Sequence, residues 1–192
     1  MKIHQLSVAY LSHQDRILVR VNTAAAQEKR LWLTRRLMLV LWPQLSKLFT
    51  RHLLKLEAAG SSLETADEGL RKMLADFRKE EFLKEADFDT PYQENQAQLP
   101  LGEAPLLVTD VDAAPLPNGL LRLSFNERSP GPEQPRNFRM DMEPKLMQGL
   151  LHLLEQALTL SQWHEAFDAG PMAVEDGAVE QGPSARKPRY LN

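Results

Sequence analysis

The chain of 192 residues contains no cysteine, and this absence removes several kinds of chemistry. Disulfide cross-links, thiol nucleophiles and zinc sites with cysteine ligands are all excluded. The longest apolar run, LMLVLW at residues 37–42, is far shorter than the about 20 residues that a membrane-spanning helix needs. The amino terminus lacks the unbroken apolar core of a signal peptide. We therefore expect a soluble, cytoplasmic protein with no membrane partner.

Recognisable catalytic and metal-binding motifs are missing as well. The 5 histidines show no ligand spacing such as HExxH. His152 falls in the apolar pattern LLHLLEQAL, where a histidine at the edge of a core is more common than a metal ligand. There is no phosphate-cradling glycine loop and no Gly-x-Ser-x-Gly. We expect a protein that is not an enzyme and holds no cofactor or metal.

The formal net charge of −3 hides a strong asymmetry along the chain. Residues 1–55 carry ten lysines and arginines against two acids, whereas residues 56–104 carry five against twelve. Such a contrast between neighbouring segments indicates that the basic part either binds an anion or is covered by the acidic part. Composition alone does not choose between these two alternatives.

Apolar periodicity in the first part of the chain predicts strands followed by helices. Alternation predicts a β-hairpin over residues 2–22 and a third strand at residues 29–33. Helical spacing then runs to residue 56, with Thr34 as N-cap and Pro43 as the site of a kink or a restart. A second helix that begins at Ser61, with an apolar stripe over residues 63–77, should fold back to give a protruding antiparallel helical hairpin.

The second part of the chain repeats the pattern of the first. PLLVTDVD and LLRLSFN predict another hairpin, NFRMDM a third strand, and residues 144–163 a helix. Arg30, Leu31 and Leu33 match Arg139, Met140 and Met142 at an offset of 109, and β-hairpin positions match at an offset of 104. We predict an α+β fold in which duplicated β-β-β-α halves form one pseudo-symmetric core, since three strands and one helix are marginal alone.

This organisation divides the chain into four parts. The predicted parts are a first β-β-β-α half (1–60), the second helix of the hairpin arm with a crossing loop (61–104), a second β-β-β-α half (105–168) and a disordered tail (169–192). The tail is assigned by its content of glycine, proline, alanine and charge.

Two resemblances accompany these patterns. The opening DRILVRVNT…RLWLTRR resembles that of a group of short, uncharacterised bacterial proteins, which implies no activity. The β-β-β-α duplication is similar in outline to PUR-repeat and Whirly-type modules, which bind single-stranded nucleic acid on a sheet face. Those modules usually have four strands per repeat, whereas three are predicted in each half here. The resemblance is topological and implies nothing about individual residues.

Strand alternation collects basic residues around a tryptophan, which we take as the candidate site. Its residues are Arg16, Arg20, Arg30, Trp32, Arg35, Arg36 and Arg139. Arginines beside an exposed aromatic ring are typical of single-strand binding, because guanidinium meets phosphate and the ring stacks on a base. Alternatively, the hairpin or a second subunit covers Trp32, and acids of residues 56–104 pair with the arginines.

Two of these arginines lie at the start of the predicted helix, where either a bound anion or an acid of this chain could neutralise them. Arg35 and Arg36 lie in the first turn, where the helix dipole disfavours positive charge. A bound phosphate would relieve this, as would Asp141 or Glu143 from the other half.

The predicted function is a non-catalytic binding or assembly protein that acts through protein–protein contacts of the sheet face and the helical arm. Its expected partner is a protein, including a second copy in a homo-oligomer. The alternative is a single-stranded nucleic-acid-binding protein that uses the Arg/Trp face. A pI near 6.0 favours the first interpretation, since nucleic-acid-binding domains are usually basic.

Overall fold

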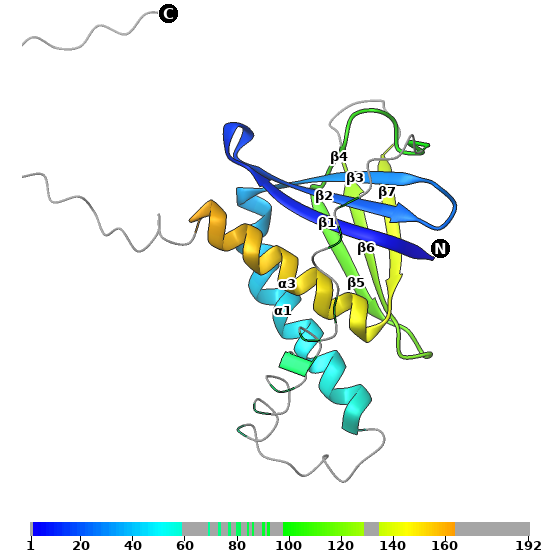
Figure 1. Cartoon of the computed structure of the whole chain (residues 1–192), viewed down its shortest axis with the longest axis vertical. Helices are drawn as coiled ribbons and strands as arrows, with labels where there is room; N and C mark the ends of the chain where they lie inside the picture. Colours follow the sequence, from blue (N-terminus) through cyan, green and yellow to red (C-terminus); the bar gives the residue numbers. More distant parts are fainter. Residues whose placement is uncertain are drawn as a thin grey trace, which may run out of the picture.

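The computed structural model describes residues 2–58, 98–128 and 135–163, and only isolated positions between 69 and 92. The described part is an α+β fold of two sheets and two long helices (Figure 1). Its elements, in chain order, are β1 (Ile3–Leu11), the short 3-10 helix η1 (Ser12–Gln14), β2 (Arg16–Thr23), β3 (Glu28–Thr34), α1 (Arg35–Ala58), β4 (Leu106–Leu107), β5 (Asp110–Pro115), β6 (Leu121–Glu127), β7 (Arg136–Met142) and α3 (Pro144–Ser161).

Each sheet contains an antiparallel three-strand meander. The first sheet has the order β1-β2-β3-β4, with β4 parallel to β3, and the second has the order β5-β6-β7.

The sequence predicted one strand over residues 105–112, and this prediction was wrong. The Val108 backbone N–H donates to the Trp32 carbonyl at 3.0 Å, whereas the Thr109 N–H donates to the Asn126 carbonyl at 2.8 Å. The segment therefore changes sheet between these two residues and joins both sheets.

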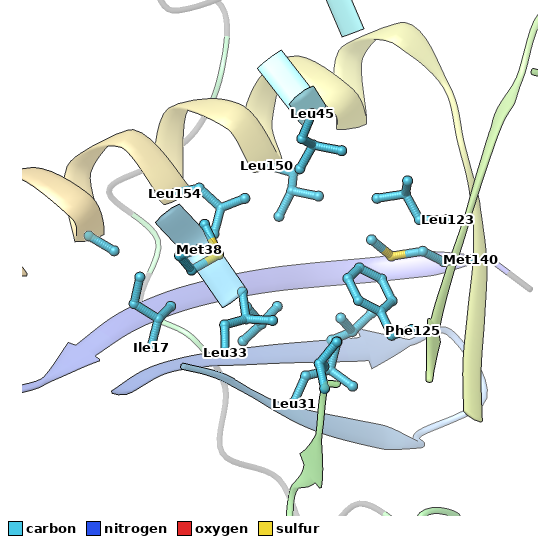
Figure 2. Close-up of a cluster of buried hydrophobic side chains, with 14 of the residues drawn as sticks. Ile17, Leu31, Leu33, Met38, Leu45, Leu123, Phe125, Met140, Leu150 and Leu154 are labelled. Carbon is cyan, nitrogen blue, oxygen red and sulfur yellow. The ribbon is translucent and has the colours of Figure 1, made fainter. Parts of the chain in front are cut away.

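The hydrophobic core lies where the two sheets and the two helices meet (Figure 2). Ile17, Leu31 and Leu33 enter it from the first sheet, and Leu123, Phe125 and Met140 from the second. Met38 and Leu45 of α1 and Leu150 and Leu154 of α3 complete it. Because all four elements contribute to one continuous cluster, the described parts of both halves fold as one unit.

The two meanders pair their strands in equivalent registers. Ile17 pairs with Leu33 in the first sheet, and Leu121, 104 positions after Ile17, pairs with Met142, 109 positions after Leu33. The pairs Val19–Leu31 and Leu123–Met140 are related by the same offsets. All these side chains are buried. The order β-β-β-α thus occurs twice with the predicted alignment, while pseudo-symmetry of the halves stays a prediction.

The helices are exchanged between the halves. α3 packs along β1 of the first sheet, and α1 contacts β5 of the second (Figure 1). The Trp163 indole N–H, just after α3, donates to Asp15 Oδ1 at 2.6 Å in the β1–β2 turn. His52 Nε2 of α1 lies 2.9 Å from the Gly119 carbonyl in the β5–β6 turn. The helix of one half therefore holds the hairpin turn of the other.

The start of α1 agrees with its predicted cap. The Thr34 hydroxyl accepts a hydrogen bond from the Leu37 backbone N–H at 3.3 Å, as an N-cap does. The predicted alternative of a restart at Pro43 was wrong, because one helix continues through this residue. Pro43 lies on the exposed side of α1, where water can satisfy the carbonyl that lacks an N–H partner.

The predicted helical arm falls on residues of which the structure describes only isolated positions. Residues 69, 73, 77, 80, 81 and 84 are helical, and the antiparallel hairpin itself lies outside the described residues. Of the predicted apolar stripe, the structure describes Met73, whose side chain is 62% exposed, and Phe77, which is 61% exposed. The predicted disordered tail at residues 169–192 also lies outside the described residues.

Candidate binding face of the first sheet

The outer face of the first sheet carries four of the seven predicted site residues. Ile17, Val19 and Val21 of β2 are buried, so alternation turns the residues between them to the other side. Leu31 and Leu33 of β3 are also buried, so the residues that alternate with them face the other side. Arg16, Arg20, Arg30 and Trp32 therefore share this outer face, and each is partly exposed.

A row of apolar side chains crosses the middle of this face. Leu18 pairs with Trp32, and these two residues pair in turn with Ala9 on β1 and Leu107 on β4. Each of the four is partly exposed. We call these residues the apolar row: Ala9, Leu18, Trp32 and Leu107. An apolar row on the outside of a sheet is a feature that the core does not require.

Each arginine near the apolar row has a contact within this chain. The Arg16 guanidinium carbon lies 5.9 Å from the centroid of the Trp32 ring. The Arg20 guanidinium lies 4.4 Å from the Tyr92 ring centroid, a cation–π distance. Arg30 Nε donates to Glu28 Oε1 at 2.5 Å, and the Glu28 side chain is only 3% exposed. The nearby positive charge is thus partly neutralised or stacked.

The alternative in which acids of residues 56–104 pair with these arginines is wrong for Arg30. The acid bound to Arg30 comes from its own strand, two residues away, and not from that segment. Tyr92 does come from that segment and lies against Arg20. Tyr92 and Glu28 were not singled out in the sequence. Glu28 follows from strand periodicity, while the position of Tyr92 depends on how the chain returns across the sheet.

The three remaining predicted residues lie elsewhere. Arg36 is exposed on α1, and Arg139 is exposed on the second sheet. Arg35 at the start of α1 lies close enough to Tyr10 for its charge to act on the phenol. Burial, together with the hydrogen bond from the Tyr10 hydroxyl to Asp15, outweighs that charge and raises the pKa of Tyr10. The structure therefore does not assemble all seven residues into one site.

The second sheet places an ion pair where the first has its tryptophan. By the two offsets, Arg122 and Asp141 correspond to Leu18 and Trp32 and pair in the same way. Arg122 Nε and Nη2 donate to the two Asp141 carboxylate oxygens at 2.6 and 2.8 Å. These hydrogen bonds lower the pKa of Asp141. Asp141, which we proposed as a counter-ion for Arg35 or Arg36, is instead held by Arg122.

Several other polar side chains of the second sheet are also paired. Asn126 Nδ2 donates to Asp110 at 2.9 Å and to Asp112 at 3.0 Å, and Arg128 binds Asp110. Arg136 binds Glu127 and the carbonyl of Leu101. Among the described residues, no group of three histidines or carboxylates is arranged to hold a metal ion.

Comparison of the chain with protein-family models, with curated proteins and with solved structures finds no match. Within the described part of the chain, neither helix is long and apolar enough to cross a membrane.

Proposed function

We propose that the chain is a non-catalytic binding or assembly protein whose docking surface is the apolar row on the first sheet, with the helical arm as a second contact. The observation that carries this proposal is the Leu18–Trp32 pair. It lies partly exposed on an outer sheet face where the equivalent pair of the second sheet is an Arg122–Asp141 ion pair. If this sheet face contacted only water, a tryptophan at that position would not stabilise it.

The composition of the face fits a protein partner. Tryptophan and arginine are the residue types most enriched at the energetic centres of protein interfaces. Trp32 and Arg16 supply both within one stacking contact, and Leu18 and Leu107 widen the apolar area around them. The exposed Met73 and Phe77 offer a further apolar contact, one helical turn apart on the arm. A partner segment with apolar residues flanked by acids would match this arrangement.

The same face suits single-stranded nucleic acid less well. Phosphate binding needs guanidinium groups that are available, whereas Arg30 is bound to Glu28 and Arg20 stacks on Tyr92. One tryptophan also provides a single stacking position. The pI near 6.0 opposes long-range attraction to a polyanion. Nucleic-acid binding therefore remains an outcome to test, and protein binding is the function proposed.

The decisive experiment uses the equivalence of the two sheets. The photo-reactive amino acid p-benzoylphenylalanine would replace Trp32 in the full chain, and Asp141 in the matched control. Irradiation in the producing cells should give one discrete protein adduct from position 32, either with another protein or with a second copy, and none from position 141. The purified adduct partner should then bind the full chain more weakly after Leu18→Ser, and equally well after Arg122→Gln.

Two results would contradict the proposal. Equal adducts from both positions, or none from either, would mean that the apolar row contacts nothing specific. An oligonucleotide that binds near 0.1 M salt, and is lost with Trp32→Ala while the fold is retained, would replace it with the nucleic-acid function. In that case the log–log salt slope should be about −0.7 for each phosphate bound.

A further inference from the structure

The exposed side of α1 carries a basic ridge, distinct from the apolar row. Four cations recur on it at helical spacing, and each of them is exposed: Arg36, Lys47, Arg51 and Lys55. At about 100° per residue, these four positions lie within about 100° of one another around the helix axis. The exposed Val40 and Gln44 lie between Arg36 and Lys47 on the same side and carry no charge.

No ion pair within the described residues reaches these four cations. The only acid of α1 is Glu57 in its last turn. The exposed side of α3 gives a useful contrast, because it carries one cation and one acid, Lys145 and Glu155. A single-sign ridge in a chain of net charge −3 therefore calls for an anionic occupant.

The chain itself contains a segment of matching charge. Residues 164–183 hold five acids and no lysine or arginine: Glu165, Asp168, Glu175, Asp176 and Glu180. This segment begins immediately after Trp163, which is fixed to Asp15 by its indole N–H. The next residue, Arg16, pairs with Thr34 directly before α1. The described chain therefore ends, at Trp163, beside the amino-terminal end of the basic ridge.

We propose that residues 164–183 of this chain lie along the basic ridge of α1 and cover it by charge complementarity. The ridge spans about 28 Å from Arg36 to Lys55, at 1.5 Å per helical residue. A segment of this size reaches at most about 70 Å when extended, so it spans the ridge with length to spare. Covalent attachment gives the segment an effective concentration in the millimolar range, which suits a weak, screened contact.

The absence of cysteine makes this proposal directly testable. A nitroxide spin label on Ala178→Cys in the full chain should broaden the amide NMR signals of residues 47–55 more than those of α3. The broadening should disappear at about 1 M salt, where the Debye length falls to about 3 Å. The triple variant Lys47→Gln, Arg51→Gln, Lys55→Gln should abolish it with little change in melting temperature. The matched control Lys2→Gln, Arg139→Gln, Lys145→Gln makes the same charge change at exposed positions elsewhere and should retain it.

Each other outcome overturns the proposal in a recognisable way. Equal broadening of α1 and α3, or none on either, means that the acidic segment does not occupy the ridge. Broadening that the ridge variant retains means that the contact is not made by these charges. Broadening seen only between isotope-labelled and spin-labelled copies in a mixture means that the occupant is the segment of a second chain.

Discussion

The two sheets use the same inner pattern and opposite outer patterns. Val19–Leu31 and Leu123–Met140 are equivalent buried pairs, whereas Leu18–Trp32 and Arg122–Asp141 are equivalent outer pairs of different chemistry. Inner positions are constrained by the shared core, which accepts only apolar side chains of suitable volume. Outer positions have no such constraint. On the docking proposal, this difference marks the outer face of the first sheet as the place where a requirement other than folding acts.

The largest expected effects come from matched truncations of the inner faces. Leu31→Ala and Met140→Ala should each lower the free energy of unfolding by about 2–5 kcal/mol, because both side chains are fully buried in one cluster. Urea denaturation followed by circular dichroism would measure both. A small loss for one variant and a large loss for the other would break the equivalence of the inner faces.

A second pair of variants compares the two hairpin turns. Asp15 and Gly119 are 104 positions apart, and both have positive φ (48° and 80°). Trp163, just after α3, binds the first turn, and His52 of α1 binds the second. Asp15→Ala should cost about 1–3 kcal/mol through the hydrogen bonds lost from Tyr10 and Trp163. Gly119→Ala should cost about 1–2 kcal/mol from its left-handed backbone, and its added Cβ would lie 3.1 Å from Leu56.

The control for the first turn is Asp15→Asn, which tolerates positive φ and keeps one acceptor oxygen. It should retain most of the stability that Asp15→Ala loses. If the two substitutions destabilised the protein equally, the carboxylate charge, and not the hydrogen bonding, would be what holds the turn.

The outer faces should respond less, and differently. Trp32→Ala should cost about 1–2 kcal/mol, less than a core truncation, because the ring is only partly buried. Asp141→Ala should change the melting temperature less than Trp32→Ala does, since exposed ion pairs contribute little. Thermal denaturation of both variants would measure these two losses of stability. A loss for Trp32→Ala as large as that for Leu31→Ala would show that the tryptophan serves the fold and would weaken the docking proposal.

The smallest expected effect is a pH dependence at acid pH that comes from the ion pair of the second sheet. Hydrogen bonds from Arg122 lower the pKa of Asp141, so its contribution to stability is complete above the ordinary aspartate value of about 3.9. That contribution is lost as the pH falls further, through the lowered pKa. Asp141→Asn should therefore make the acid side of the stability profile shallower, while Trp32→Phe should leave its slope unchanged. Melting temperatures from pH 5 downward would measure both slopes.

Periodicity predicted the parts of this fold that depend on local sequence. The order β-β-β-α in each half, the cap at Thr34 and the buried positions of β2, β3, β6 and β7 all follow from side-chain alternation and helical spacing. The change of sheet at Val108 was missed, because a strand's alternation does not reveal which neighbour it pairs with.

The candidate site was predicted only as far as one face. Arg16, Arg20, Arg30 and Trp32 do lie together, since they belong to adjacent paired strands. Arg36 and Arg139 do not, because a helix face and a second sheet separate them from the others. The Tyr92 ring against Arg20 and the Arg122 pairing of Asp141 are set by three-dimensional contacts across 72 and 19 positions of chain. Sequence spacing contains no signal for such contacts.

The exchange of helices between the halves bears on the ancestry of the chain. α3 packs against β1, and α1 contacts β5. One β-β-β-α unit by itself would therefore leave its first strand without a helix packed on it. If the chain arose by duplication, the ancestral unit could bury that strand only by exchanging helices with a second copy of itself. Gene fusion would then have joined two subunits of a swapped dimer into one polypeptide. After such a fusion the two outer faces would have been free to diverge, one toward a paired polar surface and the other toward Leu18 and Trp32.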